Sequence, residues 1–322
     1  MTKVSPTIAY SFNSPLPFVG RLRAKLAEHP SAPHIIDMSN DGPAWGVPPE
    51  ADFLICAFTG WDLAPAEKPA QWPHGLRHIH VLNAGVDKFP AWFFDDVPVT
   101  CGRGVSSVAI AEFVMAAVLG REKKLVELSR RGAGDPLPGI RGVAGKTIGL
   151  VGAGAIGRAV AERALSFGMT VLATTRSGRA PEGLEVEVVS IEDLMRRSDH
   201  VAICAPLTEA TRGLFDARLL GLAKPDLHLI NVARGEIVDQ DALLAALNDG
   251  RLGFATLDVT VPDPLPAGHP LAGRPDTMIT PHISWMAEDN FERLVAVTLD
   301  VVDCYARGVE PRDYLVSAEH RY

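Results

Sequence analysis

The stretch GLVGAGAIGRAVAERALSFGMTVLATTRSGR, residues 149–179, decides the fold of this chain. Three glycines, Gly152, Gly154 and Gly157, stand in G-x-G-x-x-G spacing directly after the apolar run KTIGLV. A helical pattern follows and ends at Gly168, and a second apolar run, MTVLATT, comes next. Strand, glycine turn, helix and strand in this order predict a βαβ unit, the building block of a parallel α/β sheet.

The glycine spacing also predicts a ligand. Gly152 allows a sharp turn, Gly154 leaves the backbone open to close approach, and Gly157 lets the helix lie against the sheet. The unpaired N–H groups of the first helical turn, at Ala155 and Ile156, attract a pyrophosphate. We therefore expect a bound dinucleotide. The alternative is a helix–strand turn that needs glycine only for packing.

The end of the second strand differs from that of a typical NAD site. An acidic residue usually stands about 20 residues after the glycines and binds the ribose hydroxyls of NAD. Here Thr175 occupies this place, and Arg176, Ser177 and Arg179 follow. Guanidinium and hydroxyl groups bind phosphate well, so we expect NADP(H) to be preferred, with NAD(H) as the second cofactor. The alternative is that the two arginines are solvated loop charges.

Strand-like and helical segments alternate along the rest of the chain. A length of 322 residues favours two domains. Apolar runs at 7–12, 34–38, 52–58 and 79–83 predict one parallel sheet, and the βαβ repeats between 102 and 286 predict another. We therefore predict an α/β protein of two Rossmann-like or flavodoxin-like domains. The first comprises 1–101 plus 287–322, and the second comprises 102–286.

Composition excludes several classes of protein. A formal net charge of -8 argues against a nucleic-acid binder. The 4 cysteines are scattered, so no metal site is expected. No apolar run is long enough for a membrane span, and the first residues lack the apolar core of a secretory signal. We expect a cytoplasmic protein without membrane or nucleic-acid partners.

Five motifs, in order, resemble the signatures of the D-isomer-specific 2-hydroxyacid dehydrogenases, a family that includes glyoxylate/hydroxypyruvate reductases. They are NAGVDKFP (83–90), GKTIGLVGAGAIGRAVAERALSFGM (145–169), SDHVAICAPLTEATRGLF (198–215), INVARGEIVDQDAL (230–243) and TPHISW (280–285). The resemblance implies an NADPH-dependent oxidoreductase that reduces a small 2-keto acid to the D-2-hydroxy acid. It also implies an active site in the cleft between a substrate domain, 1–101 with 287–322, and a dinucleotide-binding domain, 102–286.

The resemblance implies three catalytic residues, Arg234, Asp263 and His282. The family usually carries a glutamate where this chain has Asp263, one methylene shorter. The chemistry agrees with these roles: an imidazole can donate the proton, a carboxylate can orient the imidazole, and a guanidinium can bind the substrate carboxylate. Glu236 and Asp239 are the alternative carboxylates.

Further contacts are implied by resemblance. For the substrate these are the backbone of Ala84, Gly85 and Val86, the side chains of Arg234 and His282, and the rings of Trp61 and Trp285. For the cofactor they are Cys204, Ala205, Pro206, Thr211, Val232, Ala233 and Asp258. Either tryptophan could instead pack in a core. The Ala-rich helix after residue 107 is expected at a homodimer interface, with simple burial as the alternative. A different function stays open, a nucleotide-sensing, partner-binding scaffold of co-repressor type without turnover.

Overall fold

The computed structural model describes residues 4–11, 18–38, 42–129 and 139–317. The chain divides into two compact units. Unit 1 comprises Met1–Val105 with Glu288–Tyr322, and unit 2 comprises Ser106–Ala287. The chain thus leaves unit 1 before the long helix α2, Ser107–Lys123, and returns to it before the last helix, α8, Asn290–Arg307.

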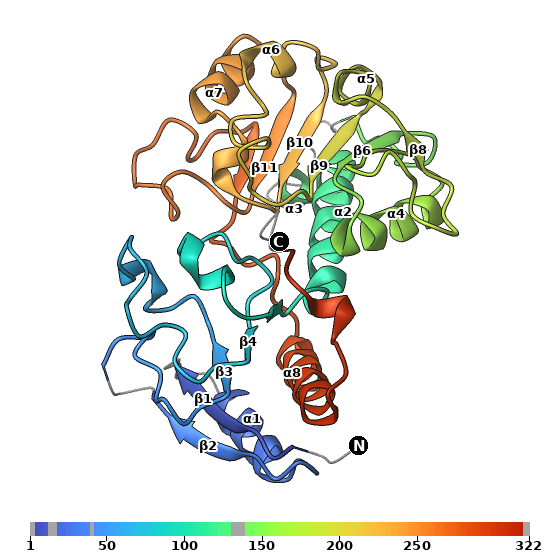
Figure 1. Ribbon diagram of the computed structural model, residues 1–322. Helices are drawn as coiled ribbons and strands as arrows, with labels where there is room; N and C mark the ends of the chain where they lie inside the picture. The colour runs from blue at the N-terminus through green and yellow to red at the C-terminus, as the bar shows by residue number, and fades with distance from the viewer. Residues whose placement is uncertain (1–3, 12–17, 39–41, 130–138, 318–322) are drawn as a thin grey trace. The chain divides into compact units, whose positions relative to one another are not determined.

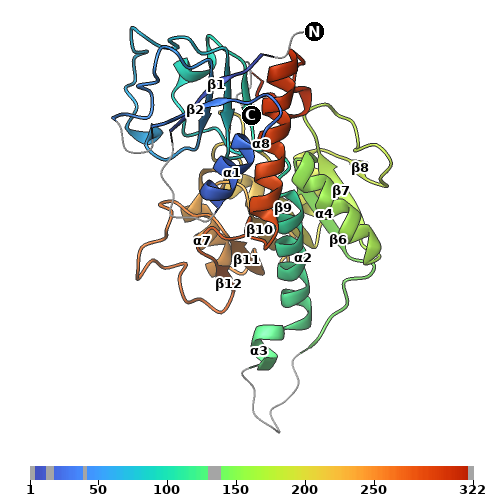
Figure 2. The ribbon, with the colours of Figure 1, turned by 90° about the horizontal axis from the view of Figure 1, so that it is seen from below.

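Unit 1 is built on a parallel sheet with the strand order β2-β1-β3-β4-β5 (Figure 1). The strands are β1 Thr7–Ser11, β2 His34–Asp37, β3 Phe53–Cys56, β4 His78–Val81 and β5 Val99–Cys101. This is the flavodoxin-like order expected for such a domain. Helix α1, Phe18–Ala27, and α8 lie side by side (Figure 2), and Arg21 of α1 forms an ion pair with Glu292 of α8.

Unit 2 is built on a parallel sheet with the order β12-β11-β10-β9-β6-β7-β8 in the described residues. The strands are β6 Thr147–Val151, β7 Thr170–Thr174, β8 Glu187–Val188, β9 His200–Ile203, β10 His228–Asn231, β11 Phe254–Leu257 and β12 Thr277–Ile279. Strand order reverses between β6 and β9, and ligands of open α/β sheets bind at the carboxyl edge at such a point. The glycine turn follows β6 and therefore lies there.

Helices cover both faces of the unit 2 sheet (Figure 1). On one face α4, Ala155–Ser166, packs against β6 and β7, and α2 packs against α4 and β10, through small and branched side chains. On the other face lie α5 Ile191–Arg197, α6 Ala217–Leu220 and α7 Gln240–Asn248. Strands β9 and β10 are buried along their whole length, as expected for central strands covered on both faces.

Three local features were not expected from the sequence. The short strands β5 and β8 were missed because neither carries an apolar run of its own. The long helical pattern after residue 106 is split, because Lys124 adopts a left-handed conformation (φ 50°) between α2 and α3, Leu125–Ser129. The short 3-10 helices are Trp61–Leu63, Ala91–Phe94, Gly235–Ile237 and Arg312–Tyr314. Among the described residues, no helix combines the length and apolarity that crossing a membrane requires.

Candidate active site

The glycine turn after β6 has the geometry of an anion-binding loop. Gly152 has φ 97°, and a Cβ there would come within 3.0 Å of the Ala205 backbone. A Cβ at Gly157 would overlap the Gly152 carbonyl oxygen, whereas one at Gly154 would meet no atom of the described chain within 4 Å. No side chain caps the N-terminus of α4, and its first turn holds no acidic residue. This open, uncapped helix end fits a pyrophosphate.

The loop after β7 carries the residues expected at a 2'-phosphate. Arg176, Ser177 and Arg179 are exposed, and the Arg179 N–H donates to the Ser177 hydroxyl at 3.3 Å. The Thr175 hydroxyl is buried without a hydrogen-bond partner among the described residues. The loop is fastened to α4, since the Arg158 guanidinium donates to the Glu182 carbonyl at 2.9 Å.

The loop after β9 combines half-buried and exposed residues. Burial raises the pKa of the Cys204 thiol to about 12, so this thiol stays protonated and unreactive. The Thr211 hydroxyl donates to the Pro206 carbonyl at 2.7 Å and accepts from the Thr208 N–H at 2.8 Å. Thr211 therefore shapes this turn, while Ala205 lies against the glycine turn through its backbone.

Arg234 follows β10 and is half-buried. Its position depends on Asn231, whose side-chain amide donates to the Arg234 carbonyl at 2.8 Å and whose Oδ1 accepts from the Ala233 N–H at 3.1 Å. Val232 is buried in the core beneath α2, so only its backbone is open to a ligand. Asn231 thus sets the direction in which the chain leaves the strand.

Asp263 and His282 are brought together by the ends of two neighbouring strands, β11 and β12. The distance between His282 Nδ1 and Asp263 Oδ2 is 2.8 Å. The aspartate, although one methylene shorter than the glutamate usual in the family, therefore lies within hydrogen-bond distance of the imidazole. His282 has φ 55°, which is uncommon for a residue with a Cβ and is typical of functional positions. The alternative carboxylate Asp239 instead caps α7 by accepting from the N–H groups of Asp241 and Ala242, both at 3.0 Å.

Two residues hold the turn that carries His282. The buried Asp258 carboxylate accepts from the Thr280 hydroxyl at 2.6 Å and from the N–H groups of Ile283 and Ser284, both at 2.9 Å. The Trp285 indole N–H donates to the His282 carbonyl at 2.9 Å, and its ring packs partly into the core of unit 2. The family resemblance implies that Asp258 contacts the cofactor and that Trp285 either contacts the substrate or packs in a core. Those contacts stay predictions, whereas the bonds to the turn are observed.

In unit 1 the expected substrate loop follows β4. Ala84 is exposed and Gly85 half-buried, while the Val86 side chain lies in the core, so Val86 could offer only its backbone. Asn83 precedes them, and its Oδ1 accepts from the Phe58 N–H at 2.9 Å. This bond links the loops that follow β3 and β4.

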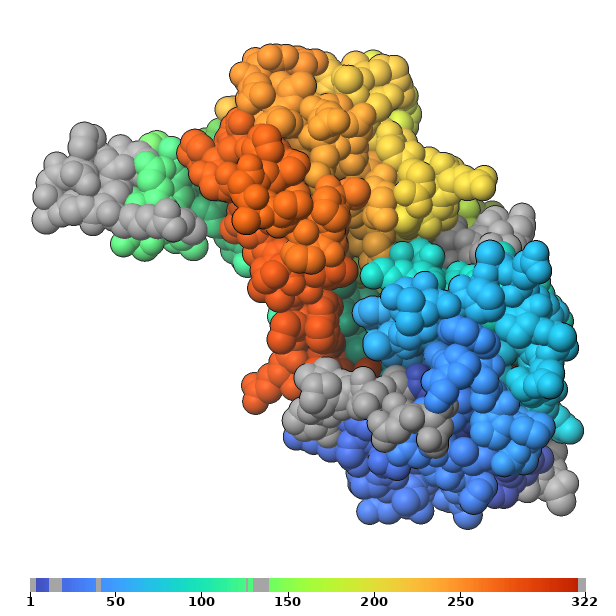
Figure 3. All heavy atoms as spheres, turned by 90° about the vertical axis from the view of Figure 1, so that its left-hand side faces the viewer, coloured from blue at the N-terminus to red at the C-terminus, as the bar shows by residue number. Residues whose placement is uncertain are grey.

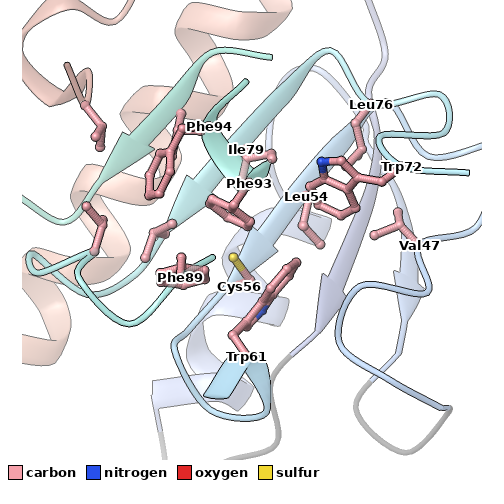
Figure 4. Packing of buried hydrophobic residues seen from close by; sticks show 14 of the residues in the cluster. Val47, Leu54, Cys56, Trp61, Trp72, Leu76, Ile79, Phe89, Phe93 and Phe94 are labelled. Carbon is pink, nitrogen blue, oxygen red and sulfur yellow. The ribbon is translucent and has the colours of Figure 1, made fainter. Parts of the chain in front are cut away.

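Trp61 requires a correction. Its ring is 1% exposed and lies in an aromatic cluster with Trp72, Phe89 and Phe93 (Figure 4). A ring with no open face cannot cap a substrate, so Trp61 is a core residue of unit 1. The exposed ring of this loop is that of Phe58, which is 40% exposed and contacts the Lys88 ammonium group.

Sequence reasoning missed Asn231, Thr280 and Gln240, which hold the site loops. The available signal was weak. Asn231 ends the apolar run LHLIN, and Gln240 and Thr280 lie within the motifs at 230–243 and 280–285 without a role assigned to them. What these side chains bond to depends on loop conformations that spacing does not reveal.

Several known proteins are similar to this chain in sequence and in fold. Residues 115–284 match the family model described as D-isomer specific 2-hydroxyacid dehydrogenase, NAD binding domain. A glyoxylate reductase of Aeropyrum pernix is 33% identical over 81% of this chain and 82% of its own length. An (S)-sulfolactate dehydrogenase of Chromohalobacter salexigens is 36% identical over 70% of this chain and 76% of its own. A D-isomer specific 2-hydroxyacid dehydrogenase from Xanthobacter autotrophicus Py2, solved in complex with NADPH and MES, superposes with a TM-score of 0.80 at 26% identity, covering 98% of this chain and 99% of that one.

Proposed function

Because the chain belongs to the D-isomer specific 2-hydroxyacid dehydrogenase family, we propose that it reduces a small 2-keto acid to the D-2-hydroxy acid with NADPH. Glyoxylate and hydroxypyruvate are the proposed substrates, since the Aeropyrum relative carries the name glyoxylate reductase. The observation that carries the proposal is the 2.8 Å contact between Asp263 and His282 at the carboxyl edge of the unit 2 sheet.

His282 is the proposed proton donor. With Nδ1–H donated to Asp263 Oδ2, the ring is held in one orientation and Nε2 is left for the substrate. The His282 side chain is 44% exposed, so a substrate can reach the ring and water can restore its proton after transfer. Nε2–H then donates to the ketone oxygen as this oxygen gains negative charge, and the product hydroxyl forms.

Arg234 is the proposed substrate-binding cation. A guanidinium binds a carboxylate through two parallel hydrogen bonds and stabilises charge on a neighbouring ketone oxygen. The backbone of residues 84–86 would bind the same carboxylate. An uncharged carbonyl compound lacks this group and is expected to be a poor substrate.

The proposed cofactor is NADP(H). The turn Gly152–Gly157 and the N-terminus of α4 would hold its pyrophosphate, and Arg176, Ser177 and Arg179 its 2'-phosphate. When bound, the nicotinamide supplies the hydride for the ketone carbon. In support, the Xanthobacter relative was solved with NADPH.

The test is a panel of 2-keto acids, including glyoxylate and hydroxypyruvate, assayed with NADPH and NADH by loss of reduced nicotinamide absorbance. We expect turnover with a higher kcat/KM for NADPH. Binding of NADPH without turnover of any keto acid would overturn the enzyme proposal and favour the nucleotide-sensing scaffold.

A substitution separates cofactor preference from turnover. Arg176→Ala should raise the KM for NADPH by roughly 10-fold and leave the KM for NADH nearly unchanged, because only NADPH carries the 2'-phosphate. Arg196→Ala, at an exposed arginine of α5, is the control and should change neither. Equal effects of Arg176→Ala on both cofactors would contradict the 2'-phosphate site.

A homodimer is the proposed assembly. Ala109, Phe113 and Ala116 of α2 line one groove with Ile283 and Met286, and Met286 is 58% exposed. Contact with a second copy would bury these apolar groups. Sedimentation of the wild type and of Phe113→Glu tests this, with dimer and monomer as the expected results.

A further inference from the structure

The side-chain amide of Gln240 forms a two-bond clamp on the loop that carries Asp263. Gln240 Oε1 accepts from the Val261 N–H at 2.6 Å, and Gln240 Nε2 donates to the Val261 carbonyl at 2.7 Å. The backbone N–H and the backbone carbonyl of Val261 are thus both bonded to the Gln240 side chain. Val261 lies two positions before Asp263, so the clamp acts close to the proposed catalytic carboxylate.

The clamped loop has few other restraints. Residues 261–264 are exposed, and even the apolar Val261 side chain is 43% exposed. Residues around 260 lie at the surface in Figure 3, within the orange region of the chain. Among the described residues, no main-chain hydrogen bond reaches residues 259–265 from another segment. Apart from the local bond of the Thr260 hydroxyl to the Pro262 carbonyl, the polar contacts of this loop within the described part of the chain are those with Gln240 and His282.

Gln240 is in turn well fixed. It is the first residue of α7, and Asp239 caps that helix.

The clamp also joins the segment that carries Arg234 to the loop that carries Asp263. A Cβ at Gly235 would overlap the Thr260 carbonyl oxygen and approach Val261 Cγ2 to 2.9 Å. The segment that follows β10 therefore packs directly on the loop that Gln240 holds.

We propose that Gln240 is a positioning residue that holds Asp263 against the His282 imidazole. The proposal rests on the proposed function, in which Asp263 orients the proton donor. Without the clamp, the exposed loop samples positions in which the carboxylate leaves Nδ1, and the ring loses its fixed orientation. Misplacement of catalytic groups by about 1 Å can cost roughly 100-fold in rate.

The experiment compares Gln240→Ala with Asp241→Ala, a change at the next, exposed residue of α7. Amide hydrogen exchange of the Val261 segment reports the clamp without any turnover. Exchange should rise roughly 10-fold in Gln240→Ala and stay unchanged in Asp241→Ala. Gln240→Glu, which keeps the acceptor for the Val261 N–H and loses the donor, is the conservative variant. It should show a smaller rise and remains informative if Gln240→Ala does not fold.

Kinetics then test whether Gln240 acts through Asp263. Gln240→Ala should lower kcat roughly 10- to 100-fold with little change in the KM for NADPH. In an Asp263→Ala background the same change should cost less than about 2-fold, because the group that it positions is absent. Unchanged Val261 exchange, or a full loss of kcat in the Asp263→Ala background, would overturn the proposal. If the wild type reduces no keto acid, the proposed function fails and the positioning role falls with it, while the exchange data still show whether the clamp exists.

Discussion

Lowering the pH is expected to destabilise unit 2 through a buried histidine pair at the amino ends of β9 and β10. His200 and His228 are each 1% exposed, and their Nδ1 atoms lie 3.3 Å apart. His228 Nε2 lies 2.8 Å from the Thr256 hydroxyl. One shared proton satisfies the two Nδ1 atoms. A further proton must therefore go to an Nε2 atom, and Nε2 of His200 is buried without a hydrogen-bond partner among the described residues.

The surroundings of His200 also oppose a positive charge. Burial is the main cause of the shift, and Lys146, Arg141 and Arg121 add to it. The Asp199 carboxylate acts in the opposite direction, and the pKa of His200 falls from 6.5 to about 4. The neighbouring Glu122 carboxylate, 3.5 Å from His200 Nε2, is already bonded by Arg141 at 2.9 and 3.1 Å. Burial also lowers the pKa of His228 well below 6.5.

The sign and size of the effect follow from these pKa values. The unfolded chain takes up a proton at His200 as the pH falls through 6.5, whereas the folded chain does so only near 4. The loss of stability therefore develops between these two values and levels off below the lower one. From about pH 7 to about pH 5, His200 alone is expected to cost about 2 kcal/mol of unfolding free energy.

Denaturant unfolding followed by circular dichroism at several pH values measures this loss. His200→Asn cannot take up the proton, so its pH-dependent loss should be smaller than that of the wild type by about 2 kcal/mol. His34→Asn is the control, because His34 of β2 is exposed in the folded protein. If wild type and His200→Asn lose the same free energy over this range, the reasoning about the buried pair is refuted.

Three further predictions concern the site. His282→Asn should lower kcat by roughly 100- to 10,000-fold. The Kd for NADPH, measured by calorimetry, should stay within about 2-fold of the wild-type value. Normal turnover would exclude the proton-donor role. Asp263→Glu introduces the residue usual in the family but should lower kcat/KM. The aspartate already lies 2.8 Å from His282, and Gln240 clamps its loop, so a longer side chain has no room to gain. A gain in kcat/KM would contradict this reasoning. Asp258→Asn places a side-chain amide against N–H donors at 2.9 Å and should lower the unfolding free energy by about 1–3 kcal/mol. Denaturant titration measures this loss, and an unchanged unfolding free energy would show that these bonds are weak.

Local pattern was sufficient for most helices and strands and for the residues of the motifs, but not for β5, β8 or the helix break at Lys124. The glycine turn appears where its spacing predicts it, because a turn with φ 97° at Gly152 and a carbonyl packed against Gly157 excludes other residues. The pairing of Asp263 with His282 was expected from resemblance, yet the reach of the shorter side chain was open until its loop was seen. Trp61 illustrates the opposite case. A tryptophan after a strand fits a core or a pocket equally well, and only its neighbours distinguish the two.

The amino-acid sequence by itself determined the two α/β sheets, the family and the positions of the chemistry-bearing side chains, because strand and helix periodicity and glycine sterics act over a few neighbouring residues. Tertiary structure alone decided which side chains hold the site loops. Gln240 and Asp258 make their bonds to backbone groups of other loops, more than twenty positions away in the sequence. Those bonds depend on the folding of parallel strands side by side, which brings the ends of distant segments to one edge of the sheet.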